Sequence, residues 1–413
     1  MSGAGLGQLG LHLLQGWFAL QALHLYLPLV GAIAARLSET SPPEAPDTPP
    51  SRLAVLIAAR DEARVITGAL QAWQAQTYPL EAYDVYVVAD HCSDQTAALA
   101  RRTGATVLER QGDGEKTKGA ALRDLWLSLD RSRYRGVVIA DADNRPAPDC
   151  LAALAAALAR GHRAVQGLRA PAGADTPTAR LDALSELCTH RIACAGRTWL
   201  GLGAPLMGSG MAFDVATFES LLVNWRPTLV EDCAWQAQLA AAGIAVFWTA
   251  EAIVRDEKTP HAAAMGQQRR RWLSGRAQAA RRHAGALLEA AVRQRRLLAL
   301  DTLLDVTAPP RSLQLLVWLT GFLLAVGGLQ PWGWGLVWGA CLALVPVYLA
   351  TALWLDGQGL RQAGAMLASL SGLPRLTWQL LRARAAALGG RPQGWIPTRH
   401  GEDPATQERG VAG

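Results

Sequence analysis

The sequence predicts an α/β domain with a Rossmann-like, mostly parallel sheet and transmembrane helices at both ends. Apolar runs of strand length alternate with helical segments between residues 53 and 140, which is typical of a parallel sheet covered by helices on both faces. Charged side chains follow several of these runs, where ligands bind in such sheets. Leu-, Ala- and Trp-rich stretches near both ends of the chain are long enough to cross a bilayer.

Length and composition are consistent with this division. A chain of 413 residues exceeds one ordinary domain, so more than one structural region is expected. The formal charge of +6 is carried almost wholly by Arg; it suits anionic headgroups or an anionic substrate and does not by itself indicate nucleic acid. The six cysteines form no C-x-x-C pair, which favours reduced thiols and a cytosolic compartment.

The stretch 9–35 is the first expected span. No basic residue precedes it and it outlasts a signal-peptide core, so a retained helix is favoured over a cleaved signal peptide. Two further spans are expected over 312–329 and 332–355, joined by an uncharged loop with two Trp residues. Basic residues flank the opposite ends of the spans, which predicts a multi-pass protein of the inner (cytoplasmic) membrane with its large middle region in the cytoplasm.

Within the middle region, four strands and three helices are expected in alternation. The strands are 53–58, 84–89, 106–109 and 137–140, and the helices are 62–74, 93–102 and 117–129. Composition divides the whole chain into an N-terminal span (1–37), a Pro-rich linker (38–51), the α/β domain (52–280), an amphipathic interfacial region (281–311), two spans (312–355), an interfacial helix with a tail segment (356–398) and a disordered tail (399–413).

Asp141 and Asp143 follow the fourth expected strand. Residues i and i+2 of a strand point to the same side, and two adjacent carboxylates repel each other unless a cation joins them. Carboxylate oxygens suit Mg2+ or Mn2+, which would neutralise a diphosphate leaving group. The alternative is a polar turn, supported by Pro146 and Pro148; the two motifs that follow favour the metal.

Glu231 and Asp232 open a helical run. Acidic residues are common in a first turn because of the helix dipole, which is the structural alternative. As chemistry, one of them deprotonates an acceptor hydroxyl, a general-base role worth roughly two to four orders of magnitude in rate. Asp232 is the favoured base.

Gln268, Arg271 and Trp272 fall at i, i+3 and i+4 and share one face of a helix. Trp offers a flat platform for a sugar ring, Arg a fork for a phosphate, and Gln a group that orients a hydroxyl. The alternative is an Arg-rich solvated helix, and a Trp amid polar residues argues against it.

Two further positions point to a nucleotide. Asp90 ends the second expected strand and suits the base edge of a nucleotide, while Ser93 or Asp94 caps the next helix. Lys116 and Lys118 stand at an expected helix start, where a lysine and the helix N-terminus favour a diphosphate. An exposed charged loop is the alternative.

In this order and spacing, the residues resemble a family. Segment 53–276 is similar to the membrane-bound family 2 glycosyltransferases, which include cellulose, chitin and hyaluronan synthases and ceramide glucosyltransferase. The matching motifs are Asp90, Asp141-Ala-Asp143, Glu231-Asp232 and Gln268-x-x-Arg271-Trp272. Residues 59–62 look like the family's A-R-N-E with Asp61 in place of Asn, and residues 208–213 like its G-N-G-M-A-F with Ser209 in place of Asn. Residues 395–399 are similar to a segment that often closes the family.

The resemblance implies a GT-A fold and a single in-line displacement that inverts the anomeric carbon, most often with a UDP-sugar donor. It assigns the site residues as follows: Glu62 and Asp90 to the nucleoside, Asp141 to the nucleotide, Lys118 near the phosphates, Asp143 to the metal, Asp232 as base, and Glu231, Gln268, Arg271 and Trp272 to the acceptor and diphosphate. Asp61 and Ser209 leave the choice of sugar donor and acceptor open.

Processive synthases of the family usually carry more spans than three. We therefore expect transfer to a lipid or cell-envelope glycan acceptor, with a processive subunit that acts with polysaccharide-assembly partners as the alternative. A nucleotidyltransferase would have little use for Asp232 or the Gln268 motif. A non-catalytic envelope-glycan assembly protein would be expected if the metal or base residues were lost, and they are all present.

Overall fold

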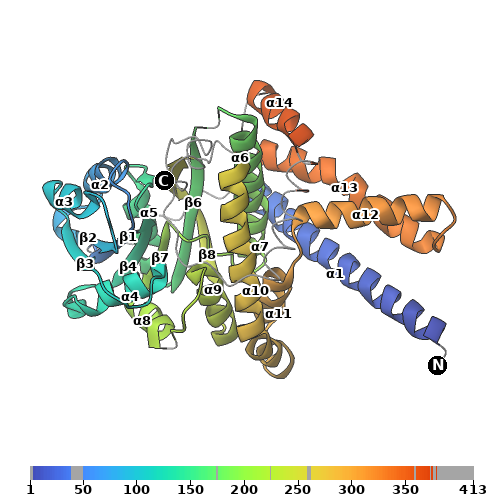
Figure 1. Ribbon diagram of the computed structural model, residues 1–413, viewed down its shortest axis with the longest axis horizontal. Helices are drawn as coiled ribbons and strands as arrows, with labels where there is room; N and C mark the ends of the chain where they lie inside the picture. Colours follow the sequence, from blue (N-terminus) through green and yellow to red (C-terminus); the bar gives the residue numbers. More distant parts are fainter. Residues whose placement is uncertain are drawn as a thin grey trace, which may run out of the picture.

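The computed structural model describes residues 3–38, 50–173, 175–223, 225–257, 262–357 and 360–372, together with Pro374 and Trp378. Most of the Pro-rich linker, most of the expected 356–398 region beyond residue 372 (including the 395–399 segment) and the 399–413 tail lie outside these described residues. The described chain forms an α/β domain from which helices α1, α12 and α13 project on one side (Figure 1).

An eight-stranded sheet forms the centre of the domain, in the order β3-β2-β1-β4-β7-β6-β8-β5. Its strands are β1 (Leu53–Ala59), β2 (Tyr83–Asp90), β3 (Thr106–Arg110), β4 (Gly136–Asp141), β5 (Arg145–Pro146), β6 (Ala164–Gly173), β7 (Met211–Asp214) and β8 (Val246–Glu257). The first four pair in parallel, as do β6 and β8, whereas β7 and β5 are antiparallel to their neighbours. The predicted mostly parallel sheet is confirmed.

Helices cover both faces of the sheet. They are α2 (Ile66–Gln74), α3 (Thr96–Arg102), α4 (Lys118–Leu127), α5 (Cys150–Ala159), α6 (Pro177–Cys188), α7 (Ala195–Trp199), α8 (Val215–Val223) and α9 (Glu231–Ala242). One apolar core packs α2 and α5 on one face, and a second packs α4, α8 and α9 on the other. All seven residues of β1 are buried, which explains why it reads as an unbroken apolar run rather than an alternating one.

The helix expected over 62–74 begins later, at Ile66. Asp61 has a left-handed backbone with φ of 55°, so it cannot start a helix. Thr96 and Asp94 hold the following turn, because the Glu62 N–H donates to Thr96 Oγ1 (2.8 Å) and the Ala63 N–H to Asp94 Oδ2 (3.0 Å).

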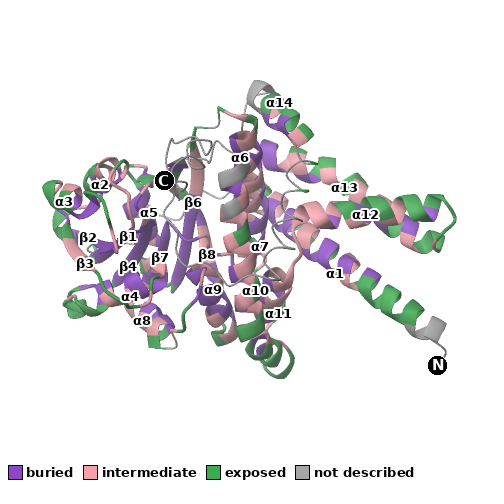
Figure 2. Ribbon diagram, in the orientation of Figure 1, coloured by how far each residue is buried: buried purple, intermediate pink, exposed green. Residues whose placement is uncertain are grey.

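Within the described part of the chain, two helices are long and apolar enough to cross a membrane: residues Gly7–Leu37 of α1 (Gly3–Leu37), and α13 (Trp332–Asp356). The other expected span falls on α12 (Arg311–Val326), which has 16 residues and alone is shorter than a bilayer requires. Helix α12 forms a third candidate span only together with α11 (Leu297–Thr307), and the two helices are bent by 82° relative to each other. The outer surfaces of these helices are exposed (Figure 2) and rich in Leu, as expected of segments surrounded by lipid.

The first span is docked tightly on the domain. A Cβ added at Gly196 of α7 would lie 1.9 Å from Pro28 O, and one at Gly31 would lie 2.4 Å from Gly196 O, so only glycine permits this crossing. Beside it, Asp301 of α11 accepts from Arg197 Nε (2.9 Å) and faces His24 Nε2 (3.0 Å). All three of these polar side chains are buried.

Helix α10 (Ala262–Arg293) continues across residue 280, where composition suggested a boundary. Together with α11 it packs on α9 through a buried apolar cluster that includes Ala237, Leu287 and Ala299. The stretch 281–311 therefore supports the helix that carries Glu231 and Asp232. Helix α14 (Leu360–Ala368) follows α13 and lies against α6.

Candidate active site

The acidic pair Asp141 and Asp143 stands at the end of β4. Asp141 is the last strand residue, but Asp143 lies in a turn closed by the Asn144 N–H, which donates to Asp141 O (3.2 Å). The expectation that both carboxylates share one side of a strand is therefore corrected. Instead, Asn144 Nδ2 donates to Asp143 Oδ1 (3.0 Å), which holds the second carboxylate beside the strand end.

A tight turn before β7 reaches this strand end. Gly208 and Gly210 have φ of 80° and 63°, conformations that glycine adopts without strain. Between them, the Ser209 hydroxyl accepts from the Asp141 N–H (3.0 Å) and donates to Asn144 Oδ1. The serine that replaces the family's usual asparagine thus links the turn to the acidic pair.

Lys118 joins three of the predicted motif segments. It is the first residue of α4, and its Nζ donates to Asp141 Oδ1 (2.5 Å) and Gly208 O (2.6 Å) and pairs with Glu231 Oε1 (3.2 Å). Burial alone lowers the pKa of the ammonium, but the Asp141 and Glu231 carboxylates more than offset this, so the Lys118 pKa is raised. The lysine therefore stays charged.

Asp232 lies in the same group. Its Oδ2 would be 3.2 Å from a Cβ added at Gly208, and its Oδ1 accepts from the Cys233 N–H (2.6 Å). Burial, reinforced by the Glu231 charge and opposed by Lys118, raises the pKa of Asp232 to about 7. A carboxylate with this pKa exchanges protons near neutral pH, as a general base must. We call Lys118, Asp141, Glu231 and Asp232 the Lys118 group.

Arg169 on β6 was missed by sequence reasoning. Its Nη1 donates to Met207 O (2.7 Å), next to Gly208, and its Nη2 donates to Asp256 Oδ2 (2.5 Å). The guanidinium helps to counter the pKa rise of Asp232. One sequence pattern could have identified Arg169: it is a charged residue directly after the buried run 164–168. The same pattern identified the acids after β4.

The nucleotide side was predicted from Asp90, which is fully buried at the end of β2. Arg110, at the end of β3, donates to Asp90 Oδ1, and His91 Nδ1 lies 3.0 Å from the same oxygen. Asp90 Oδ2 is buried without a partner among the described residues, so it has an unused capacity to accept a hydrogen bond. Arg110 was not predicted.

The N-cap of α3 is Gln95, which makes no side-chain capping hydrogen bond, so neither predicted residue occupies the cap position. Asp94, one residue earlier, accepts from the Thr96 N–H through its Oδ1 (2.9 Å). Ser93 does not cap this helix; its N–H and hydroxyl donate to Asp61 Oδ1 (2.6 and 3.0 Å). Ligand atoms of Asp61, Cys92 and Asp94 all lie within 4.8 Å of one another. The bonds to Ser93 and Thr96 account for this clustering, so we do not assign a metal to it.

Gln268, Arg271 and Trp272 lie on α10 as predicted, each partly buried. Two contacts place this part of α10: Arg269 Nη2 donates to Asp182 Oδ1 of α6 (2.8 Å), and Gly275 packs against Val230, the residue before Glu231. In the part of the chain that the structure describes, no hydrogen bond or ion pair joins Gln268, Arg271 or Trp272 to the Lys118 group. Helix α10 is thus placed beside Val230, at the start of the segment that carries Glu231 and Asp232.

The arrangement of a mostly parallel sheet with acids from two motifs around one lysine agrees with comparison to known families. A model described as "Glycosyltransferase like family 2" matches residues 49–275, more than half of the chain. The chain belongs to this glycosyltransferase family. No curated protein matches it closely in sequence. The family membership makes the protein a glycosyltransferase, but it does not select among the cellulose, hyaluronan and ceramide subfamilies.

Comparison with solved structures finds several that are similar to this chain. The mannosyltransferase PcManGT from Pyrobaculum calidifontis, in complex with GDP-Man and Mn2+, is 19% identical with a TM-score of 0.55 over 87% of this chain and 98% of that chain. Staphylococcus aureus TarS 1-349 is 13% identical with a TM-score of 0.45 over 75% and 93%. Glucosyl-3-phosphoglycerate synthase from Mycobacterium tuberculosis, with Mn2+, UDP and glucosyl-3-phosphoglycerate, is 17% identical with a TM-score of 0.39 over 59% and 80%. The similarity to PcManGT confirms the predicted GT-A fold.

Proposed function

We propose that this glycosyltransferase transfers a sugar from a nucleoside-diphosphate sugar to a lipid or cell-envelope glycan at the cytoplasmic face of the inner membrane, with inversion at the anomeric carbon. One observation carries the proposal: Lys118 gathers carboxylates from two separate motifs, beside a third carboxylate whose proton affinity suits a base. A donor such as UDP-sugar or GDP-sugar is supported by the GDP-Man complex of PcManGT.

In the proposed reaction, Asp232 accepts the proton of an acceptor hydroxyl. The hydroxyl oxygen attacks the anomeric carbon on the face opposite the diphosphate, which inverts that carbon. The bond from the anomeric carbon to the diphosphate oxygen breaks, and the nucleoside diphosphate takes its electron pair. Lys118, held 2.5 Å from Asp141 at the start of α4, lies where it stabilises the charge of the departing phosphate.

The donor set fits a divalent metal. Asp141, Glu231 and Asp232 bring three carboxylates to one ammonium, so the site holds more negative charge than Lys118 balances, and carboxylate oxygens are hard ligands. Asp143, beside Asp141, would hold Mg2+ or Mn2+, and the bound ion would supply neutralisation of the diphosphate charge. The Mn2+ in PcManGT supports this choice.

The remaining predicted residues fit the same scheme. Glu62 and Asp90 are assigned to the nucleoside, where Asp90 Oδ2 is a buried acceptor with no partner among the described residues. Gln268, Arg271 and Trp272, with Glu231, are assigned to the acceptor and diphosphate. The packing of α10 on Val230, the residue before Glu231, supports this assignment.

Membrane attachment rests on α1 and α13, with the bent α11–α12 pair as a possible third element. Few spans favour transfer of one or a few sugars over processive synthesis. A processive subunit with polysaccharide-assembly partners is the second candidate, and polymer made by the purified protein alone would favour it.

The test uses full-length protein in nanodiscs with a panel of nucleotide sugars and total membrane lipid as acceptor. We expect release of one nucleoside diphosphate that depends on Mg2+ or Mn2+ and is lost in Asp143→Ala and Asp232→Asn. The matched control is Asp149→Asn, at an exposed carboxylate outside the site. Equal release by wild type and both site variants would contradict the assignment.

A further inference from the structure

Trp225 lies between the two helices that begin at the catalytic site. It belongs to the connection between α8 and α9, and its ring packs on the first turn of α4, where a Cβ added at Gly119 would overlap the indole. Only glycine therefore lets the indole lie against this turn. Gly119 directly follows Lys118, so the ring contacts the backbone next to the lysine of the Lys118 group.

A series of hydrogen bonds joins the same indole to the N-cap of α4. Trp225 Nε1 donates to Glu115 Oε2 (3.1 Å), and the other carboxylate oxygen of Glu115 accepts from Thr117 Oγ1 (2.6 Å). Thr117 is the N-cap residue, and its hydroxyl oxygen accepts from the Ala120 N–H (3.3 Å). The indole thus contacts the backbone of the turn that carries Lys118 and also holds the cap of that turn.

A second ring contact joins the indole to α9. Trp225 meets Trp235 edge to face with the ring centroids 6.5 Å apart, a geometry that aromatic pairs favour. Trp235 is fully buried and lies one turn after Glu231. Trp225 therefore packs between the first turns of α4 and α9, whose first residues, Lys118 and Glu231, pair at 3.2 Å.

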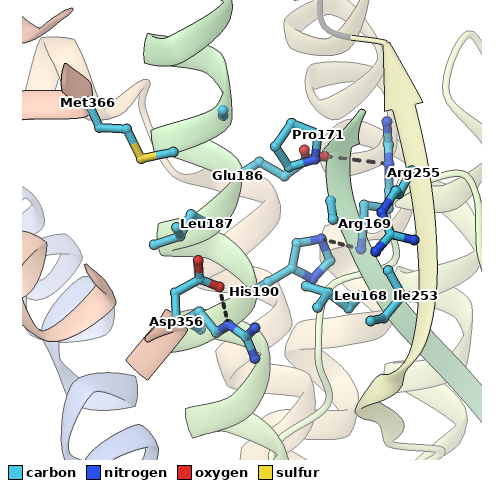
Figure 3. A pocket seen from close by; sticks show the side chains of 13 residues that line it. Leu168, Arg169, Pro171, Glu186, Leu187, His190, Ile253, Arg255, Asp356 and Met366 are labelled. Carbon is cyan, nitrogen blue, oxygen red and sulfur yellow. Dashed lines mark hydrogen bonds and ion pairs between the residues drawn. The ribbon is translucent and has the colours of Figure 1, made fainter. Parts of the chain in front are cut away.

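The position of Lys118 matters because the other nearby cation has partners of its own. Figure 3 shows Arg169 of β6 beside Glu186, with which it pairs (3.4 Å), and its guanidinium also pairs with Asp256 (2.5 Å). Within the described part of the chain, Lys118 alone forms ion pairs with Asp141 and Glu231. A diphosphate that enters this site therefore depends on the contacts that keep the Lys118 ammonium in place.

We propose that Trp225 is a positioning residue for the sugar donor. By holding the first turn of α4 against α9, it keeps the Lys118 ammonium where the diphosphate of the nucleotide sugar binds. The inference rests on the proposed function, because it requires a nucleoside-diphosphate donor at the Lys118 group. In this role Trp225 acts through Lys118, and its loss removes a charge that is already oriented before the donor arrives.

Binding of a nucleoside diphosphate tests this inference without knowledge of the sugar or the acceptor. Full-length protein in nanodiscs is titrated with UDP and with GDP in the presence of Mn2+, and calorimetry measures the affinity. We expect Trp225→Leu to weaken binding of the preferred nucleotide roughly tenfold, as for loss of a charge-assisted hydrogen bond. Trp225→Phe keeps a ring against Gly119 and should retain most of the affinity. The matched control is Trp126→Phe, at a fully buried position of the same helix, which should lower stability and leave the affinity unchanged.

A double-mutant cycle then separates positioning from simple packing. In a Lys118→Ala background, Trp225→Leu should cause no further loss of affinity, because the residue through which Trp225 acts is absent. Gly119→Ala disturbs the same contact from the other side, since its methyl group would overlap the indole. It should give the same pattern, and it replaces Trp225→Leu if that variant does not fold.

The pH dependence of turnover provides a second measurement. Lys118 opposes the effect of the Glu231 charge on the pKa of Asp232, so displacement of Lys118 in Trp225→Leu should move the acid limb of turnover to higher pH. A loss of packing alone would reduce the amount of folded enzyme and leave the limb in place.

Two results would overturn the inference while the proposed function stands. One is equal nucleotide affinity in wild type, Trp225→Leu and Gly119→Ala, and the other is an equal loss of affinity with and without Lys118. Wild-type protein that binds neither UDP nor GDP would overturn the proposed function itself, and this inference with it.

Discussion

Two buried ionic groups in this protein contain the same kinds of residues and differ in their balance. In the Lys118 group, three carboxylates surround one ammonium. In the group that docks α1, Asp301 faces Arg197 and His24. The nearby carboxylate of Asp305 also acts on Arg197 and is countered by Arg276 and Arg311, so cations match the carboxylates. The second group satisfies its own charges, whereas the first retains negative charge that an incoming cation or a proton must neutralise. We infer that imbalance, rather than burial or charge alone, distinguishes the reactive group from the structural one.

Packing supports this distinction. The Arg197 group lies between α1, α7 and α11, beside a backbone crossing that admits only glycine, so its members have little room to move. Asp141 of the Lys118 group is half-buried, with 31% of its side-chain surface accessible, and the turn that approaches it is built on two left-handed glycines. A ligand can therefore reach the unbalanced group and cannot reach the balanced one.

The largest expected effect comes from removing the base. Asp232→Asn preserves shape and should lower kcat by roughly two to four orders of magnitude, because the acceptor hydroxyl keeps its proton. A timed assay of nucleoside diphosphate release measures kcat. Calorimetry of nucleotide-sugar binding checks that the donor site is intact. A variant that binds the sugar donor and turns it over at the wild-type rate would exclude Asp232 as the base.

Breaking the balanced group should affect stability instead. Arg197→Met leaves the Asp301 carboxylate buried without its closest cation and should reduce the free energy of unfolding by about 3–5 kcal/mol. Chemical denaturation in detergent measures the change, and Arg293→Met, at an exposed arginine of α10, is the control. If Arg197→Met instead lowered the activity per folded molecule and left stability unchanged, Arg197 would have a role in the reaction. The distinction between a structural and a reactive ionic group would then be wrong.

The pH dependence sharpens the contrast. Because burial raises the pKa of Asp232 to about 7, turnover should rise with pH through that value and fall about tenfold per unit below it. The free energy of unfolding should change in the opposite direction. Because the pKa of Asp232 is higher in the folded protein than in the unfolded chain, the folded protein loses stability as pH rises from about 4 to 7. In metal-free protein, the free-energy difference between Asp232→Asn and wild type should therefore grow over this range. A flat difference would contradict the raised pKa.

The smallest effect is expected at the turn. Gly208→Ala would place a Cβ 3.2 Å from Asp232 Oδ2 in a backbone with φ of 80°, which costs about 1–2 kcal/mol. We expect a modest loss of stability and a several-fold lower kcat, since the methyl group displaces the base. Gly161→Ala, with φ of 90° and open space around it, has the same strain without the contact, so it separates the two effects. Equal kcat in both variants would show that the base tolerates the methyl group.

Much of the fold followed from local sequence. The predicted strands agree with the observed ones within one residue. Three of them, β1, β2 and β4, are mostly buried and therefore read as apolar runs, whereas β3 at the sheet edge has no buried residue. Helices α9 and α10 carry their motifs as expected. The start of α2 was predicted too early, since the turn after β1 depends on Asp94 and Thr96 from a distant loop.

The site was predictable where chemistry is concentrated in short motifs and unpredictable where partners are far apart in sequence. Lys118, Asp141 and Asp232 were identified, but the Ser209–Asn144 link and the role of Arg169 depend on contacts across 38 or more residues. The same holds for His24 of the first span, whose partners Arg197 and Asp301 lie 173 and 277 positions away. The periodicity of a sequence does not predict pairs of residues that are so far apart along the chain.

The glycine crossing between α1 and α7 has a consequence for substrate choice. With Pro28 O only 1.9 Å from where a Gly196 Cβ would stand, the first span and the catalytic domain touch backbone to backbone and cannot swing apart. With α1 placed in the bilayer as proposed, Asp232 would be held at a constant distance from the bilayer surface. We therefore expect the enzyme to select acceptors by length. A lipid should be modified only when its headgroup extends far enough from the bilayer to reach Asp232.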